Sequence, residues 1–293
     1  MKILVLGSKG QIGMCLEEQL KKFTSFEVIF SSRSNLDITN LTDFNAAVNN
    51  INPDIIINTA AYTNVDKAED EKVTAELINN LAVQNLSQLC TDKNIALIHI
   101  STDYIFDGSS DIPYLETDVG NPISFYGKSK LDGEIAITNS GCKFVILRTS
   151  WVYSEYGNNF VKTIVRLCKD QDKISIIDDQ IGCPTYAQDI AKAIINITHF
   201  IQKDICEWGI YNYCGNTPLT WYQFAQMISK KNIHVDNDVE ILPISSVEYS
   251  ARAMRPKFSL LNCSKYQENF KSDLSNLKKG LERTLGVLNL EKL

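Results

Sequence analysis

Metal motifs and membrane-crossing segments are both missing from this sequence. Its eight cysteines are scattered over 293 residues, and no two of them have the Cys-x-x-Cys spacing of a zinc or redox site. Scattered thiols of this kind favour reduced, mostly buried side chains in a cytoplasmic protein. No apolar run approaches the length that spans a bilayer, and the run after Lys2 is too short for a signal peptide. We therefore expect a cytoplasmic location and no membrane partner.

Positive charge and histidine are also in short supply. The 29 Lys and Arg residues are outnumbered by 35 Asp and Glu residues, which gives a net charge of −6. This balance argues against a nucleic-acid partner, which would usually need a basic surface. An anionic small ligand is still allowed, because a local pocket can be positive on an acidic protein. None of the three histidines lies where nucleophilic catalysis would need it, and we expect His99 to be a core residue of an apolar strand.

Short apolar runs alternate with amphipathic stretches through the first half of the chain. Such continuous apolar runs suit parallel strands that are covered on both faces. We expect strands at 3–6, 28–30, 55–58, 96–100 and 145–148, and helices at 11–22, 41–50, 74–93 and 126–138. This alternation predicts an α/β fold with a Rossmann-type, doubly wound parallel sheet.

The second half is less regular, and prolines punctuate it. We expect helices at 158–169, 186–200, 221–231 and 274–288, with a short strand at 174–177. The predicted dinucleotide-binding domain comprises residues 1–150 and 181–214. Residues 151–180 and 215–293 form a smaller C-terminal substrate-binding lobe, which would leave a cleft at the carboxyl edge of the sheet.

A glycine-rich turn joins the first strand to the first helix. Gly7, Gly10 and Gly13 have the spacing Gly-x-x-Gly-x-x-Gly, and Gln11 and Ile12 open the helix. Glycines there permit a tight turn and let a pyrophosphate approach the backbone. The helix N-terminus then offers free N–H groups to that anion. The turn predicts a dinucleotide cofactor.

The end of the second strand bears on the choice of cofactor. An acidic residue there would bind the ribose hydroxyls of NAD, but this chain has Arg33. A guanidinium suits a 2′-phosphate, so we expect NADPH, with NADH as the alternative if Arg33 is only a solvated surface residue. Asp37 and Ile38 follow and could flank the adenine. The end of the third strand would leave room for the dinucleotide, through Ala60, Ala61, Tyr62 and Thr63.

Tyr126 and Lys130 lie four residues apart, on one face of a predicted helix. A phenol beside an ammonium group is a proton donor whose pKa can be lowered toward neutrality. Thr102, at the end of the fourth strand, offers a second hydroxyl. The set suits reduction of a ketone, in which a proton must arrive together with hydride.

With these motifs, residues 1 to about 265 resemble the extended short-chain dehydrogenase/reductases, and within them the dTDP-4-dehydrorhamnose reductases. The most specific segments are 101–108 (Ser-Thr-Asp-Tyr-Ile-Phe-Asp-Gly), 126–134, 148–153, 157–160 and 179–185, with Arg255-Pro256 further on. The resemblance implies reduction of the C4 ketone of dTDP-4-dehydro-6-deoxy-L-mannose to give dTDP-L-rhamnose, with NADPH or NADH as the hydride source. Such an enzyme would serve surface polysaccharide biosynthesis.

The resemblance also implies residue roles. Tyr126 would donate the proton, Lys130 would bind the nicotinamide ribose and lower the tyrosine pKa, and Thr102 would hydrogen-bond the reacting oxygen. Asp103, with Thr102, would contact the sugar, and Trp151 would pack along the hexose ring. Arg255 is a candidate ligand for the substrate diphosphate, or else an arginine that packs between the lobes.

Some members of the family form dimers bridged by a metal held on carboxylates near the first helix. The chain has Cys15 two residues after Gly13, so we expect no metal, while a homodimer stays open. Three alternative functions also stay open. The protein could reduce another nucleotide-linked 4-keto-deoxysugar. It could be a dehydratase or epimerase, although dehydratases carry an acid where this chain has Tyr104. Finally, it could be a non-catalytic regulatory subunit.

Overall fold

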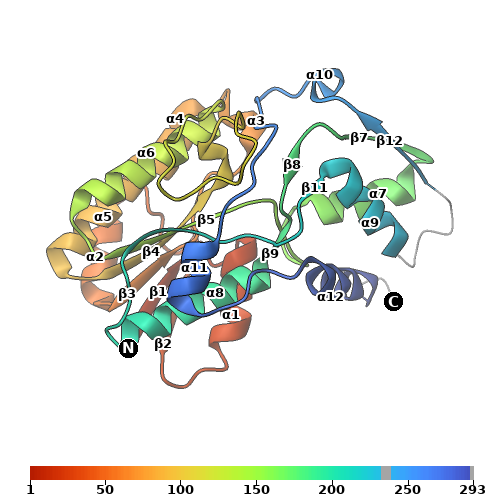
Figure 1. Ribbon diagram of the computed structural model, residues 1–293. Helices are drawn as coiled ribbons and strands as arrows, with labels where there is room; N and C mark the ends of the chain where they lie inside the picture. The colour runs from red at the N-terminus through yellow and green to blue at the C-terminus, as the bar shows by residue number, and fades with distance from the viewer. Residues whose placement is uncertain (232–238, 291–293) are drawn as a thin grey trace.

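The computed structural model describes residues 1–231 and 239–290, and its centre is a six-stranded, fully parallel sheet. The strand order is β10-β5-β4-β3-β1-β2 (Figure 1). The strands are β1 (Lys2–Leu6), β2 (Glu27–Ser31), β3 (Ile55–Asn58), β4 (Ala96–Thr102), β5 (Phe144–Thr149) and β10 (Gly209–Asn212). The chain reverses its direction across the sheet between β1 and β3, which is where ligands bind in folds of this kind. The predicted Rossmann-type sheet is confirmed.

Helices cover both faces of this sheet, as its all-apolar strands require. Alternate residues of each strand enter different cores: Ile3 and Val5 pack on one face, whereas Leu4 and Leu6 pack on the other. The first face is covered by α1 (Gln11–Leu20), α8 (Ala187–Gln202) and α11 (Ser264–Phe270). The opposite face is covered by α2 (Leu41–Ile51), α5 (Ala82–Lys93) and α6 (Phe125–Ser140).

The predicted helix at 74–93 is a composite of three segments. It comprises α4 (Lys72–Glu76), a π-helical turn η1 (Leu77–Leu81) and α5. Asn79 lies in the π-helical turn and is buried, and its side-chain amide bonds both the N–H and the C=O of Tyr62. The widened turn therefore anchors the segment that follows β3, which includes the short helix α3 (Val65–Ala68).

The smaller lobe has its own apolar core and lies beside the sheet (Figure 1). Its main elements are α7 (Phe160–Asp170), β7 (Lys173–Ile177), α9 (Trp221–Lys231), β12 (Glu240–Ile244) and α12 (Leu277–Leu290). The remaining short elements are η2 (Asp103–Ile105), β6 (Val152–Tyr153), β8 (Ile181–Gly182), β9 (Thr185–Tyr186), β11 (Leu219–Thr220) and α10 (Ser246–Tyr249). The exact division into two domains stays a prediction. The structure adds that α11 packs Tyr266 and Phe270 into the sheet core.

Six strands of the structure are absent from the sequence prediction: the two-residue strands β6, β8, β9 and β11, and the longer β10 and β12. β10 reads Gly-Ile-Tyr-Asn, which is too short and too mixed to show an apolar run. β12 contains Pro243 and is largely exposed, as an edge strand beside β7 can be.

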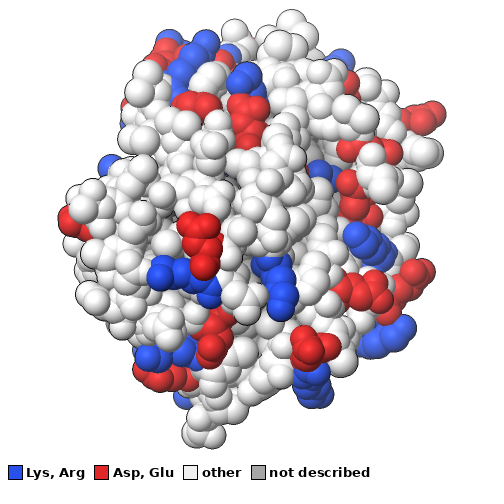
Figure 2. Space-filling model, turned by 90° about the vertical axis from the view of Figure 1, so that its left-hand side faces the viewer, with Lys and Arg blue, Asp and Glu red and all other residues white. Residues whose placement is uncertain are grey.

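Among the described residues, no helix has both the length and the apolar character that crossing a membrane requires. On the face drawn in Figure 2, acidic and basic side chains are interspersed among uncharged residues.

Candidate active site

Two adjoining cavities follow the carboxyl edge of the sheet. The first has a volume of about 510 Å³ and the second about 540 Å³, and Gly10, Thr59, Ala61 and Thr63 line both. Predicted residues in the first cavity are Gly7, Gly10, Arg33, Asp37, Ile38, Ala60, Ala61, Tyr62 and Thr63. Predicted residues in the second are Gly10, Gln11, Ile12, Ala61, Thr63, Thr102, Asp103, Tyr126, Lys130 and Trp151. Because the two cavities share four lining residues, they form one continuous groove along the edge of the sheet.

The backbone segments of the glycine turn approach one another so closely that only glycine fits at two of its positions. Gly7 has φ +77°, and a Cβ there would lie 2.6 Å from Ala60 N. A Cβ on Gly13 would lie 2.3 Å from Gly7 O. Gly13 does not line either cavity; it lets the start of α1 pack against the turn. Gly10 is the N-cap, so the N–H groups of the first turn are available where the two cavities meet.

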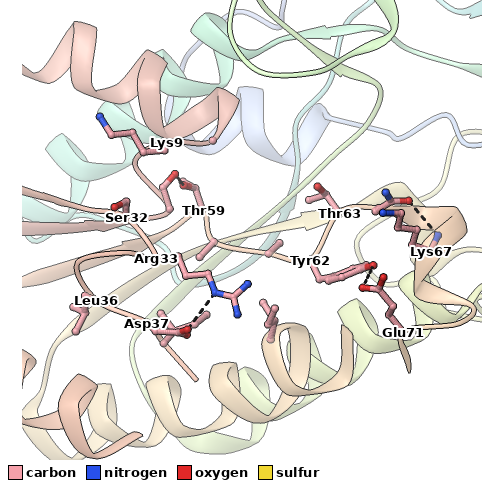
Figure 3. Close-up of a pocket in the computed structure, with 17 residues that line it drawn as sticks. Lys9, Ser32, Arg33, Leu36, Asp37, Thr59, Tyr62, Thr63, Lys67 and Glu71 are labelled. Atoms are coloured by element: carbon pink, nitrogen blue, oxygen red, sulfur yellow. Dashed lines mark hydrogen bonds and ion pairs between the residues drawn. The ribbon is translucent and has the colours of Figure 1, made fainter. Parts of the chain in front are cut away.

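Charged side chains surround the mouth of the first cavity (Figure 3). Arg33 is three-quarters exposed, and its Nε lies 3.2 Å from Asp37 Oδ2. Lys9 and Lys67, which the sequence did not single out, add two more cations to the lining. The Tyr62 hydroxyl instead donates to Glu71. The lining therefore carries three cations and the two carboxylates of Asp37 and Glu71 beside a glycine turn, and its cations could meet phosphate groups.

The second cavity brings Thr102, Tyr126 and Lys130 together, although they come from different elements. Thr102 ends β4, and its hydroxyl donates to Asp103 Oδ1 at 3.1 Å. Ser124 caps the N-terminus of α6 by accepting from Gly127 N, so the helix starts with its first turn facing the cavity.

The phenol of Tyr126 does not have the lowered pKa that the sequence suggested. Burial raises its pKa to about 12, and a hydrogen bond with Thr102 opposes this only in part. The Lys130 amine is engaged elsewhere, since its Nζ lies 2.7 Å from Ile100 O and 3.1 Å from His99 Nε2. Burial lowers the Lys130 pKa to about 8. The prediction of a lowered tyrosine pKa is therefore wrong for this arrangement.

Three buried oxygens in this cavity lack a hydrogen-bond partner among the described residues. They are Ser101 Oγ, Asp103 Oδ2 and Thr149 Oγ1. Ser101 and Thr149 lie at the ends of the paired strands β4 and β5, and burial raises the Asp103 pKa to about 6. Buried polar atoms in native proteins are nearly always paired. Their position in the cavity wall fits a polar ligand such as a sugar or a carboxamide.

Trp151 lines the cavity in a constrained setting. Its backbone φ is +46°, which is rare for a bulky residue and is concentrated at functional sites. Its ring stacks on Trp221 with centroids 3.4 Å apart, and a Cβ on Gly182 would lie 2.3 Å from it. The indole is thus held from two sides.

Arg255 is not part of the lining of either cavity. Its Nη2 lies 2.6 Å from Asp66 Oδ2 in α3, and its side chain is mostly buried. The structure thus places Arg255 in a contact between the C-terminal segment and α3, and its predicted role toward diphosphate stays a prediction. Within the described ranges, no group of three or more His, Cys, Asp or Glu side chains is arranged to hold a metal ion.

Two buried polar residues beneath the second cavity were missed as site components. Asn58 and His99 are register partners on β3 and β4, and neither is exposed. The predicted core position of His99 is confirmed by its complete burial, whereas its contacts with Asn58 and Lys130 are absent from the sequence prediction. The available signal was that two neighbouring strands each carry one polar residue among isoleucines and leucines.

Known proteins share this fold and much of this sequence. The RmlD substrate binding domain model matches residues 1–289. A dTDP-4-dehydrorhamnose reductase of Aggregatibacter actinomycetemcomitans is 39% identical, over 96% of this chain and 97% of its own length. Two crystal structures of dTDP-4-dehydrorhamnose reductases superpose well. That from Bacillus anthracis, in complex with NADP, has a TM-score of 0.88, 34% identity and 99% coverage of both chains. That from Clostridium acetobutylicum has a TM-score of 0.91, 35% identity, and coverage of 99% of this chain and 100% of its own. The chain therefore belongs to the RmlD substrate binding domain family.

Proposed function

We propose that this protein is an NAD(P)H-dependent reductase that converts dTDP-4-dehydrorhamnose into dTDP-L-rhamnose for surface polysaccharide biosynthesis. The observation that carries the proposal is the convergence of Thr102, Tyr126 and Lys130 in one cavity wall, next to a glycine-lined groove. The relatives named for this activity match almost the whole chain. A cytoplasmic location is supported by the eight free cysteines, and a homodimer stays open.

The groove fits a dinucleotide, and NADPH would supply hydride when bound. The turn at Gly7 and Gly10 would receive the pyrophosphate against the N-terminus of α1. Arg33, with Lys9 close by in the same lining, would meet a 2′-phosphate. The relative crystallised with NADP supports this choice of cofactor.

Tyr126 would deliver the proton. A phenol with a pKa of about 12 remains protonated across physiological pH, so it already carries the proton when the ketone binds. As the carbonyl oxygen gains negative charge, its basicity rises and the proton can pass to it. Thr102, within hydrogen-bond reach of Tyr126, would stabilise the same oxygen where charge develops.

The unpartnered oxygens would hold the sugar. Asp103 and Ser101 lie beside Thr102 at the end of β4, and Trp151 borders the same cavity. An aromatic ring next to hydroxyl-binding groups is a common environment for a hexose. This would orient the C4 ketone toward Tyr126 rather than merely retain the substrate.

The direct test is to mix the protein with NADPH and dTDP-4-dehydrorhamnose and to follow absorbance at 340 nm. We expect oxidation by the wild type and a loss of about 100-fold or more in kcat for Tyr126→Phe. The same variant should still show a thermal shift with NADPH, since the phenyl ring keeps the packing. Tyr222→Phe, in the lobe core, is the matched control and should retain activity. No oxidation by the wild type would refute the assignment.

A further inference from the structure

A continuous chain of polar side chains runs beneath the second cavity. Asn58 Nδ2 lies 3.0 Å from His99 Nδ1, and His99 Nε2 lies 3.1 Å from Lys130 Nζ. Lys130 Nζ also lies 2.7 Å from Ile100 O. Asn58, His99 and Lys130 are each at most 2% exposed, so water cannot easily replace a badly matched partner.

The backbone decides the orientation of the first member of this chain. Ala60 N–H donates to Asn58 Oδ1 at 3.1 Å, which identifies that atom as the acceptor end of the amide. The other end, Nδ2, can only donate, and it faces His99 Nδ1. The histidine must accept at Nδ1. A neutral ring therefore carries its hydrogen on Nε2.

That hydrogen points at the Lys130 amine. An ammonium group has three donors and no acceptor, so it would meet the Nε2–H donor to donor. A neutral amine accepts from His99 and still donates to Ile100 O. Reversing the ring tautomer would only move the mismatch to the contact of Asn58 with His99. Flipping the amide as well would move it to the contact with Ala60.

We propose that His99, oriented by Asn58, is a positioning residue that presents Nε2–H to Lys130 and thereby sets the pH at which this amine takes up its proton. The consequence for catalysis rests on the proposed function of the protein, in which Lys130 lies in the wall of the catalytic cavity. The hydrogen-bonding pattern itself does not depend on that function. Burial of both groups acts in the same direction, since it also favours neutral His99 and neutral Lys130.

Other titratable groups near Lys130 do not remove this effect. Glu134, one turn further along α6, favours the charged amine, but it is fully engaged by Arg148 of β5 at 2.7 Å. Tyr126 is neutral at physiological pH, and Asp103, which follows the end of β4, accepts from Thr102. His99 is the titratable group in direct contact with the Lys130 amine.

The first test reads the tautomer without using activity. The chain has only three histidines, so ¹⁵N-histidine labelling with long-range ¹H–¹⁵N spectra at pH 7 resolves each ring, and His99→Gln assigns the signals of interest. We expect neutral His99 with its proton on Nε2. A proton on Nδ1, or a charged ring, overturns the proposal.

The second test compares pH profiles of kcat/KM for wild type, His99→Phe, His99→Gln and the remote control His199→Phe. Phenylalanine keeps the ring shape but removes the donor, which favours the protonated amine. The limb of the pH profile that reflects titration of Lys130 should therefore move up by about one pH unit. Glutamine can present N–H to Lys130 and should stay close to wild type, as should the control. A limb that does not move in His99→Phe overturns the proposal.

The two tests separate the possible failures. A purely structural role for His99 would lower the rate without moving the limb. If His99→Phe does not fold, the tautomer of His99 measured in the wild type decides whether the proposal holds. If the wild type reduces no substrate, the proposed function fails, and the tautomer again decides the inference alone.

Discussion

At the scale of single residues, burial of the Asp103 carboxylate costs free energy that hydrogen bonds with Ser259 and Thr102 offset only in part. Its carboxyl is buried with one unpartnered oxygen, and its pKa is about 6 instead of the ordinary 3.8. A raised pKa means that the folded state disfavours the charged form. The protein should therefore gain stability from this group as the pH falls from above 6 toward 4.

Asp103→Asn tests this sign. The amide keeps the acceptor for Thr102 but cannot be charged, so we expect higher stability than wild type at pH 7.5, by up to about 3 kcal/mol. The gain should shrink toward zero near pH 4, and reductase activity should fall. Urea unfolding at both pH values measures it. Asp107→Asn is the contrasting control, because hydrogen bonds lower the Asp107 pKa to about 2 and the sign reverses.

Arg33 decides between two cofactors. If it binds a 2′-phosphate, Arg33→Ala should raise KM for NADPH by about tenfold or more while leaving KM for NADH nearly unchanged. Steady-state kinetics with both cofactors measure the effect. Arg252→Ala is the control, since Arg252 is another exposed arginine paired with an aspartate. An unchanged KM for both cofactors would mean that Arg33 is only a solvated surface residue.

Residue-level prediction from sequence worked where a motif was local. Tyr126 and Lys130 share a helix face, and Thr102 ends a strand that points at the same edge, so their convergence follows from the fold class. The partner of Lys130 could not be derived in this way. The contact of Asn58 with His99 joins residues 41 positions apart, and it depends on the register of two strands. Apolar patterning alone does not give that register.

At the scale of elements, α6 offers an internal comparison of two ion pairs. Glu134 accepts from Arg148 Nε and Nη2 with both partners at most 4% exposed, whereas Lys128 and Asp132 form an exposed pair on the same helix. Glu134→Gln should cost about 3–5 kcal/mol, because it leaves a buried guanidinium without its counter-charge. Asp132→Asn should cost less than about 1 kcal/mol. Denaturant unfolding of both variants measures the difference, and equal costs would contradict it.

The start of α1 depends on a residue with no side chain. Gly13→Ala should destabilise the protein by about 1–3 kcal/mol and weaken NADPH binding, because the new methyl group would press on the backbone of Gly7. Gly286→Ala is the matched control inside α12, where no atom lies within 4 Å of the added carbon. It should stabilise by about 0.5–1 kcal/mol through helix propensity. Thermal unfolding with and without NADPH reads both effects.

Element prediction succeeded where apolar runs were long and failed where they were short. β1 to β5 and the amphipathic helices α1, α2 and α8 match the predicted positions to within a few residues. The missed elements include β10, β12, α11 and the two-residue strands β6, β8, β9 and β11. Each is short and takes its place from tertiary contacts rather than from its own pattern, as the burial of Tyr266 and Phe270 of α11 against the sheet shows.

At the scale of the whole molecule, the groove runs from the end of β2 to the segment after β5, with the small lobe beyond it. Ion pairs link α3 and the turn after it to the C-terminal segment: Asp66 of α3 pairs with Arg255, and Asp70 of the turn pairs with Arg252. The partners are 189 and 182 positions apart in the sequence, so no local pattern predicts these contacts. The division into a sheet domain and a lobe stays a prediction, and the contacts between α3 and the C-terminal segment could not be predicted from a local pattern.

Elements from the second half of the chain complete the sheet and its helical cover. α8, α11 and β10 all follow residue 150, yet they cover one face and pair with the outer side of β5. A fragment that ended at residue 150 would present an apolar sheet face to solvent and an unpaired strand edge. Such edges recruit strands from other chains and lead to aggregation. During synthesis the sheet therefore cannot be completed until the second half of the chain has been made. A translational pause or premature stop near residue 150 would expose an aggregation-prone intermediate rather than a functional nucleotide-binding domain.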